Sequence, residues 1–256
     1  MHVNSISNNP YLNNNLSFKH WNRTVYNYLS DGKKCISHRN DTYFFRDNEL
    51  WRDFVLFFTD KFKHLSKVNV YDYGCSNGEE IYTFLMCLSS MFPEEVINKF
   101  SNITAKDIDE VAIKKALQNL YTINCKEKEQ INLYTRNKFN IFFIQKKYTP
   151  GDSFILYKVI KELYDKVNFS VGDIKKDYIN ITPNNNIIFM RNFLPYIDNW
   201  GERQQLLRNI GKQLHKDSFI VIGEYDVRGT NYKINNEIID AGFTRTRIPY
   251  VFEKIY

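Results

Sequence analysis

The sequence has no apolar run approaching the roughly 20 residues that a membrane-spanning helix requires. Its amino terminus is rich in Asn and Ser and lacks the organisation of a secretory signal peptide. These two absences argue against membrane insertion and secretion. We therefore expect a cytoplasmic protein.

Cysteine is scarce, and its spacing suggests no structural role for the thiols. The four cysteines, Cys35, Cys75, Cys87 and Cys125, form no C-x-x-C pair, and only Cys35 with His38 has the spacing of two metal ligands. No second pair is present to complete such a site. The sequence therefore predicts neither a metal centre nor disulfide bonds.

Charge of one sign is not concentrated in any segment. The net charge is +6 and the pI is near 8.9, yet there is no long run of Lys and Arg. This balance favours acidic partners, whereas the dispersed pattern does not indicate nucleic acid. With 43% hydrophobic and 16% aromatic residues, a chain of 256 residues can bury a substantial core. We expect a packed globular protein.

The most informative stretch is a short apolar strand that leads into a turn of small residues. Val70–Tyr73 is followed by Gly74-Cys75-Ser76-Asn77-Gly78 and then by a helical pattern at residues 81–88. This order is typical of the first βα turn of a nucleotide-binding sheet, where glycines let the backbone approach a ligand. A purely structural turn is an equally simple explanation. Cys75 fits this turn as a space-filling residue, with a reactive thiol as the alternative.

Two further segments place polar residues at strand ends, in the order that such a sheet requires. Residues 103–109 read as a strand ending in Asp107 and Asp109, and residues 186–192 as a strand ending in Arg191 and Asn192. An acid at the end of the second strand can accept hydrogen bonds from both ribose hydroxyls of a nucleoside. The turn lacks the G-x-G-x-x-G spacing expected for a pyrophosphate. S-adenosylmethionine (SAM), a nucleoside without phosphates, therefore fits best.

Four motifs in this order resemble the signatures of CheR-type methyltransferases, which esterify glutamates of bacterial chemotaxis receptors. They are N-x-T-x-F-F-R at residues 40–46, C-S-x-G-E-E-x-Y at 75–82, D-I-D at 107–109 and R-N-x-x-x-Y-x-D at 191–198. The closing residues 243–256 also resemble the family's last strands. The resemblance implies a SAM-dependent methyltransferase that acts on protein glutamates. It also implies a protein substrate with an acidic surface, such as the cytoplasmic domain of a chemoreceptor.

The resemblance and the strand order together predict an α/β fold of the Rossmann-like methyltransferase class. We expect a doubly wound, mostly parallel sheet, a short helical amino-terminal region and a small antiparallel β insertion. Residues 1–39 form the helical lead-in, on the helix-like spacing within residues 17–36, and residues 40–256 form the methyltransferase domain. Apolar residues at helical spacing over 51–62 predict a core helix.

The insertion is expected at about residues 126–166. Residues 139–145 and 153–159 read as two strands around the turn Thr149-Pro150-Gly151-Asp152, which predicts a hairpin. This hairpin could be a purely structural insertion, or it could bind a partner.

By resemblance, the catalytic side chains are Arg46, Arg191 and Tyr196. Arg46 is expected near the methionine end of the cofactor, and Arg191 and Tyr196 on the substrate side. Arginine suits this task because its planar fork can bind a carboxylate through two hydrogen bonds. A surface ion pair with Asp47 or Glu49 is the alternative for Arg46, and a core aromatic position is the alternative for Tyr196.

The resemblance also implies a set of cofactor-binding residues. Asp107 is supported by the strand-end argument as well, whereas Asp173 stands where the family has an asparagine and so lacks the amide donor. Thr42 could equally cap a helix. Glu80 lies in the first turn of a helix, where the helix dipole favours an acid, so it could equally have this structural role. The full set is Asn40, Thr42, Arg46, Gly74, Ser76, Gly78, Glu80, Asp107, Asp173, Ile174, Met190 and Arg191.

The expected chemistry requires no general base. A glutamate carboxylate, with an ordinary pKa near about 4.3, is already ionised at pH 7. The enzyme then has to orient the carboxylate, the methyl carbon and the sulfur in line and to exclude water. The histidines fit this expectation, because none lies within a strand-end motif; they are His2, His20, His38, His64 and His215.

Two departures from the family pattern keep other functions open. Only 39 residues precede Asn40, where family members usually have a longer helical domain with basic helices for receptor docking, and Pro195 interrupts the apolar run after Asn192. One alternative is a methyltransferase of this fold that acts on a small molecule or on a non-carboxylate acceptor. Another is a catalytically silent SAM-binding regulator.

Overall fold

A computed structural model describes residues 25–28, 34–37, 42–46, 48–146, 155–197 and 199–255. The chain divides into two compact units, residues 1–39 and 40–256. In the first unit, β1 (Val25–Tyr28) and β2 (Lys34–Ser37) form an antiparallel pair. The helix expected within residues 17–36 is therefore wrong for these segments. Val and Tyr favour strands, and Asp31-Gly32 is a hairpin signal, so local preference outweighs the helix-like spacing.

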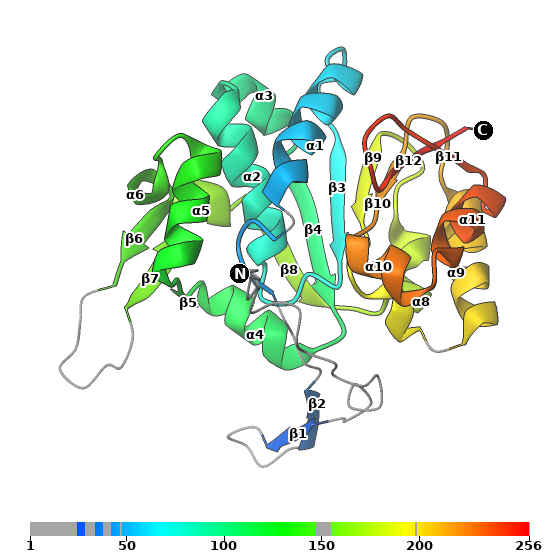
Figure 1. Ribbon diagram of the computed structural model, residues 1–256, viewed down its shortest axis with the longest axis horizontal. Helices are drawn as coiled ribbons and strands as arrows, with labels where there is room; N and C mark the ends of the chain where they lie inside the picture. The colour runs from blue at the N-terminus through cyan, green and yellow to red at the C-terminus, as the bar shows by residue number, and fades with distance from the viewer. Residues whose placement is uncertain are drawn as a thin grey trace, which may run out of the picture. The chain divides into compact units, whose positions relative to one another are not determined.

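The second unit is built on a seven-stranded sheet with the order β11-β12-β10-β9-β3-β4-β8 (Figure 1). The five strands β8, β4, β3, β9 and β10 are parallel. Strand β12 pairs with β10 in antiparallel orientation, and β11 pairs with β12 in antiparallel orientation at the edge of the sheet. This arrangement confirms the doubly wound, mostly parallel α/β fold. The strands are β3 (Asn69–Tyr73), β4 (Asn102–Asp107), β8 (Val167–Val171), β9 (Asn186–Phe189), β10 (Phe219–Val221), β11 (Phe243–Arg245) and β12 (Val251–Lys254).

Central strands are buried on both faces, so they read as continuous apolar runs rather than alternating ones. In the run that starts at β9, Ile187 and Phe189 belong to one hydrophobic core, and Ile188 and Met190 belong to the other. Successive side chains of a strand point to opposite faces, which explains this division. The sheet is therefore the middle layer between two cores.

Helices supply the outer layers, with α1 and α2 on one side of the sheet and α9 and α11 on the other (Figure 1). Helix α1 buries Trp51, Phe54 and Phe58, as its apolar spacing predicts. The helices are α1 (Asn48–Lys61), α2 (Glu79–Met91), α3 (Glu94–Lys99), α4 (Glu110–Gln118), α5 (Cys125–Thr135), α6 (Phe139–Phe142), α7 (Lys161–Tyr164), α8 (Ile174–Asp177), α9 (Trp200–Gln213), α10 (Glu224–Gly229) and α11 (Lys233–Asp240), with short 3-10 helices η2 (Tyr178–Asn180) and η3 (Leu194–Tyr196).

A separate antiparallel sheet has the order β5-β7-β6, with β5 (Tyr121–Thr122), β6 (Phe143–Gln145) and β7 (Leu156–Val159). The pairing of β6 with β7 matches the predicted hairpin, although its predicted turn at 149–152 lies outside the described residues. The first half of the segment predicted as a strand is instead α6, which buries Phe139 and Phe142. A short apolar run is compatible with either structure, which is why the sequence pattern was ambiguous here.

The order of the parallel strands reverses at β3. The chain moves from β3 to β4 and β8 on one side, and then returns to β9 and β10 on the other side of β3. Such a switch point leaves a crevice beyond the carboxyl ends of the strands, where α/β proteins bind ligands. The fold therefore places the predicted site between the ends of β3, β4 and β9.

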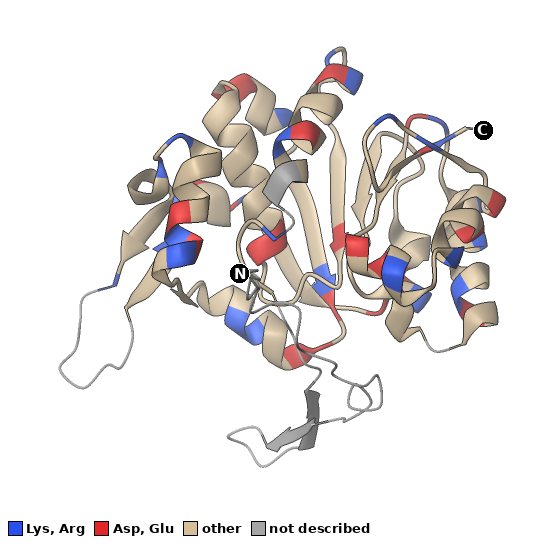
Figure 2. Cartoon of the chain, viewed as in Figure 1, with Lys and Arg blue, Asp and Glu red and all other residues tan. Residues whose placement is uncertain are grey.

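Basic and acidic residues are interspersed along the helices of the described chain (Figure 2), in keeping with their dispersed pattern in the sequence. Among these helices, none combines the length and the apolar character needed to cross a membrane.

Candidate cofactor and acceptor site

The turn between β3 and α2 has an unusual backbone. Gly74, Ser76 and Gly78 all adopt positive φ angles, of 75°, 50° and 93°. The N–H of Gly74 donates to the carbonyl of Lys106 at 2.8 Å, which holds the turn over the end of β4. A Cβ on Gly74 would lie 2.7 Å from the ring of Phe193, and a Cβ on Gly78 would lie 2.7 Å from Phe169. Packing within the chain therefore requires both glycines, whether or not a ligand is near.

Asp107 ends β4 beside this turn and is almost completely buried. One carboxylate oxygen accepts from the N–H of Ser76 at 2.8 Å, and the other accepts from the N–H of Asp109 at 2.8 Å. These bonds fix the orientation of the carboxylate. A carboxylate has about four acceptor positions, so this geometry is compatible with further hydroxyl donors.

Asp109 lies two residues beyond the end of β4, rather than at the end of the strand as the sequence pattern predicted, and it has a different role. Its side chain is the N-cap of α4 and accepts from the N–H of Val111 at 2.8 Å. The structure thus separates two acids that are two positions apart in the sequence: Asp107 faces the glycine turn, and Asp109 begins a helix.

Several polar atoms around the turn are buried without a hydrogen-bond partner among the described residues. They include Oγ of Ser76, Oδ1 of Asn77 and both carboxylate oxygens of Asp72. Burial, followed by the charges of Glu80 and Asp107, raises the pKa of Asp72 well above its ordinary value, although the charge of Arg191 opposes the shift. Unsatisfied polar atoms are costly in a protein interior. Their concentration here fits a site that is completed by a polar ligand.

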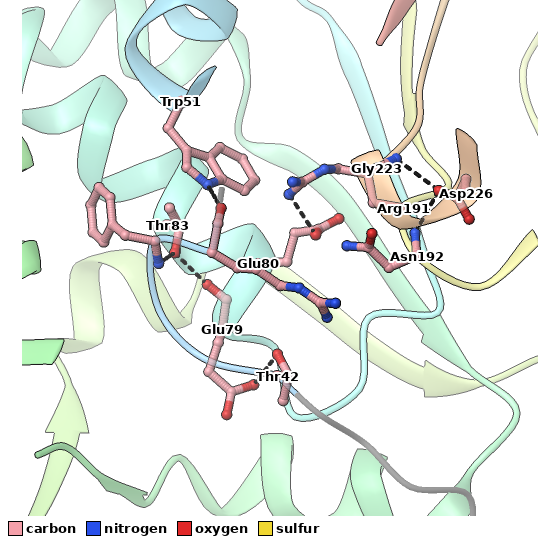
Figure 3. A network of polar contacts seen from close by, with 11 residues as sticks. Thr42, Trp51, Glu79, Glu80, Thr83, Arg191, Asn192, Gly223 and Asp226 are labelled. Carbon is pink, nitrogen blue, oxygen red and sulfur yellow. Dashed lines mark hydrogen bonds and ion pairs between the residues drawn. The ribbon is translucent and has the colours of Figure 1, made fainter. Parts of the chain in front are cut away.

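Glu80 and Arg191 form an ion pair that joins the first helix of the site to the end of β9 (Figure 3). The Nη1 of Arg191 donates to Oε2 of Glu80 at 2.8 Å, and the Arg191 side chain is only 1% exposed. The guanidinium also lies over the ring of Trp51, 4.7 Å from its centroid. Two residues predicted to act on the cofactor and on the acceptor are thus bound to each other, and Arg191 is covered by an aromatic side chain.

The segment 42–46 is bound to helices α2 and α5 through polar contacts. The hydroxyl of Thr42 donates to Glu79 at 3.2 Å (Figure 3). The N–H of Phe44 donates to Glu127 at 2.9 Å, and the N–H of Phe45 donates to Thr83 at 3.0 Å.

The next residue, Arg46, is half-buried, and its carbonyl accepts from the indole N–H of Trp51 at 2.5 Å. Trp51 therefore contacts both predicted arginines, and it links Arg46 to the pair formed by Arg191 and Glu80. The acids named as alternative partners of Arg46 are not described in their side chains.

Burial raises the pKa of Glu79 to about 7 from its usual 4.5, although hydrogen bonds from its own backbone, Asn77 and Thr42 oppose the shift. Between these two pH values the folded protein holds a proton that the unfolded chain has lost. The free energy of unfolding should therefore fall as the pH rises through this window, by about 3 kcal/mol from this group alone.

We expect Glu79→Gln to remove that part of the pH dependence. Urea unfolding of both proteins at pH 5 and at pH 8 measures it, and any contribution from Asp226, whose pKa is also raised, is common to both proteins and cancels. Equal differences between the two pH values in the two proteins would show that Glu79 is ionised throughout.

The remaining predicted residues take different positions. Asp173 is the N-cap of α8 and accepts from the N–H of Lys175 at 3.0 Å, while Ile174 and Met190 are buried. Tyr196 is 48% exposed, and its ring lies 5.9 Å from that of Tyr225. This exposure argues against the core position considered for Tyr196. Asn40 lies outside the described residues.

Cys75 is buried in the turn, and burial together with the neighbouring acids raises the pKa of its thiol well above the ordinary value. Such a thiol stays protonated, which favours the space-filling interpretation over a reactive one. In the described part of the chain, no three His, Cys, Asp or Glu side chains are grouped so that they could hold a metal ion.

Sequence reasoning missed three contributors to this site. Trp51 was assigned only to the core, yet it contacts both Arg46 and Arg191. Glu127 binds the segment 42–46 from α5, and Asp226 binds the loop after β9 from α10. The only signal for Glu127 and Asp226 is an acid within an otherwise ordinary helix, which does not identify a site.

The fold and the site together define a nucleoside-binding α/β protein. The sheet is doubly wound and mostly parallel, and its switch point combines a glycine turn, an oriented acid at the end of the neighbouring strand and unsatisfied polar atoms. Comparison with known proteins gives the family. The model of the family described as CheR methyltransferase, SAM binding domain, matches residues 40–239. The chain therefore belongs to this family, and SAM is the cofactor of its domain.

A chemotaxis protein methyltransferase of Borreliella burgdorferi is 27% identical over an alignment of 197 residues that covers 74% of this chain and 65% of that protein. Two solved structures of methyltransferases are similar to this chain at low identity. The N-methyltransferase NodS from Bradyrhizobium japonicum WM9, in complex with S-adenosyl-l-homocysteine (SAH), is 12% identical, with coverage of 84% of this chain and 90% of that one and a TM-score of 0.45. Magnesium protoporphyrin IX methyltransferase from Synechocystis PCC 6803 is 13% identical, with 81% and 78% coverage and a TM-score of 0.40.

Proposed function

We propose that the protein transfers a methyl group from SAM to a glutamate carboxylate of a protein substrate. The observation that carries this proposal is the convergence of Asp107, Glu80 and Arg191 beyond the ends of β4, β3 and β9, around the glycine turn. These residues come from three of the four family motifs. Family membership and the chemotaxis methyltransferase relative support methyl transfer, and the relative supports a protein substrate.

The residues present fit SAM. Asp107 is oriented by two backbone N–H groups and would accept hydrogen bonds from the ribose hydroxyls. Glu80, held by Arg191, offers a carboxylate to the cationic methionine end, and Thr42 and Ser76 offer hydroxyls. When bound, SAM supplies a methyl group that is already activated by its positively charged sulfur.

The chain's own contribution is orientation and exclusion of water. Phe44 and Phe45 are buried within the segment that leads to Arg46 and anchor it to the protein: Phe44 packs on Tyr121 and Phe143, and Phe45 stacks on Tyr134. Arg46 is half-buried and Tyr196 is exposed, which suits groups that meet an acceptor carboxylate. Arg191 is covered by Trp51 and bound to Glu80, so we assign it to the cofactor side of the site. No proton has to be removed from a carboxylate, in agreement with a site that has no histidine at its strand ends.

The substrate and the location belong to the same proposal. The net charge of +6 favours an acidic protein surface, for which the cytoplasmic domain of a chemoreceptor is the first choice. A cytoplasmic location follows from that choice. Residues 40–256 would act as the methyltransferase domain, with the antiparallel sheet as its insertion and residues 1–39 as a lead-in.

Label transfer tests this function. The protein is incubated with methyl-labelled SAM and an extract of the cells from which it comes, and labelled proteins are separated by size. We expect a labelled protein band that releases volatile methanol in mild alkali. Label that survives alkali would place the methyl group on nitrogen or another acceptor, and label confined to small molecules would exclude a protein substrate.

We expect Arg46→Ala to lower the rate of this transfer at saturating SAM by at least about a hundredfold, because a charge-assisted pair of hydrogen bonds to the acceptor carboxylate is lost. The backbone carbonyl that binds Trp51 is retained, so the fold should remain. Arg208→Ala, which removes an exposed arginine of α9, is the matched control and should leave the rate unchanged. An equal rate for Arg46→Ala and the wild type would remove Arg46 from the catalytic set.

A further inference from the structure

The loop after β9 is held by one buried carboxylate on a different element. Asp226 lies in α10 and is completely buried. One of its oxygens accepts from the N–H of Asn192 at 2.6 Å and from the N–H of Gly223 at 2.7 Å (Figure 3). The other oxygen accepts from the N–H of Leu194 at 3.0 Å. A single side chain therefore satisfies two backbone donors of the loop and one donor at its own helix start.

Asn192 depends on this support. Its φ angle is +65°, a left-handed conformation that is costly for most side chains, and its Oδ1 is buried without a hydrogen-bond partner among the described residues. The amide packs directly on Gly223, where an added Cβ would lie 2.1 Å from Oδ1. The side chain is thus placed by packing, and the strained backbone is retained through its bond to Asp226.

The residues before and after Asn192 are those assigned to the reaction. Arg191 holds Glu80 and stacks on Trp51, and Tyr196 stands exposed at the end of the same loop. We propose that Asp226 is a positioning residue: by binding the N–H groups of Asn192 and Leu194, it sets the place of Arg191, and hence of the Glu80 carboxylate that receives the cofactor. This inference rests on the proposed use of that site.

Replacement by asparagine gives a specific pattern because the amide has one acceptor and one donor end. The variant keeps most hydrogen bonds if its oxygen faces Asn192 and Gly223, and its NH₂ group then faces the N–H of Leu194. In Asp226→Asn, the amide proton of Leu194 should lose its protection, while that of Asn192 should be affected less. In Asp226→Ala both should be lost.

Gly223→Ala displaces Asn192 without touching the charge of Asp226. A Cβ at this position must push the Asn192 side chain, so the same loop should move. The matched control is Gly211→Ala in α9, whose Cβ would lie 2.0 Å from the carbonyl oxygen of Ala241, a backbone clash in a different part of the fold. This variant shows how a general loss of stability changes amide exchange and SAM affinity when the loop after β9 is not altered directly.

The test uses amide hydrogen exchange by NMR on the full chain, together with equilibrium titration with SAM. We expect exchange to rise at least about tenfold at the N–H of Leu194 in Asp226→Asn and across the loop in Gly223→Ala. The affinity for SAM should fall roughly tenfold in both variants. The N–H of Met190, which donates to Val221 within the sheet, should keep its protection and serves as an internal reference. Gly211→Ala should leave both the loop and the affinity unchanged.

Two results would overturn the inference: unchanged loop exchange and SAM affinity in Asp226→Asn, or an equal loss of both in Gly211→Ala. The exchange measurement needs neither cofactor nor acceptor. A failure of the proposed reaction, seen as the absence of an alkali-labile methyl product, is therefore separable from a failure of this assignment.

Discussion

Asp107→Ala is expected to weaken SAM binding by about a hundredfold or more. The substitution removes the carboxylate that accepts hydrogen bonds from two ribose hydroxyls, and each of these bonds contributes about 1.5 kcal/mol or more. The change also leaves the N–H groups of Ser76 and Asp109 without their present acceptor. Isothermal titration with SAM measures the affinity, and thermal unfolding measures the accompanying loss of stability.

Asp109→Ala is the matched control, because Asp109 is a buried acid only two residues beyond Asp107, at the start of α4. Its loss removes the N-cap of α4 and should cost about 1 kcal/mol of stability. The affinity for SAM should change little. If the two variants bind SAM equally well, or if both lose affinity in proportion to their stability, the assignment of Asp107 to the ribose is wrong.

Arg191→Ala is expected to destabilise the protein by about 3–5 kcal/mol, because it removes one partner of a buried ion pair and leaves Glu80 without its cation. SAM affinity should fall by at least about tenfold as well, since Glu80 loses the contact that orients it. The free energy of unfolding and the affinity for SAM are both measured at low temperature, at which the variant is expected to remain folded.

The chain offers a second buried pair as a control for stability. Arg203 on α9 binds Glu237 on α11 through two contacts of 2.7 Å, away from the strand ends. Arg203→Ala should cause a similar loss of stability with no change in SAM affinity of the folded protein. An equal loss of affinity in both variants would mean that Arg191 acts only through the fold.

The strand ends could be predicted from sequence because their order follows general rules. An apolar strand followed by a glycine turn and an amphipathic helix has few structural solutions, and a parallel sheet brings the carboxyl ends of its strands to one edge. Gly74, Asp107 and Arg191 therefore converge as predicted from three separate motifs. The role of each one toward the cofactor stays a prediction.

The pairings between distant segments could not be predicted. Arg191 and Glu80 are 111 residues apart, and nothing in their local patterns shows that each is the other's partner. Asp226 is separated from Asn192 by 34 residues and lies in a short helix without a motif. Such contacts depend on how α10 packs against the loop after β9, which is a property of the tertiary structure.

The two segments whose secondary structure was predicted wrongly have a feature in common. Residues 25–28 share the apolar spacing of a helix and the composition of a strand, and residues 139–142 form a short apolar run that suits both. Period alone cannot decide such cases. The first became a strand, in accord with its β-branched and aromatic composition, and the second became a helix that buries two phenylalanines.

A crystal structure of the protein with SAH would show directly whether the strand ends bind the cofactor. We expect the ribose hydroxyls at the carboxylate of Asp107, the amino-acid end beside Glu80 with its Arg191 contact retained, and the sulfur directed toward Arg46 and Tyr196. If the nucleoside binds elsewhere, or if its ribose does not contact Asp107, the assignment of the cofactor site is wrong.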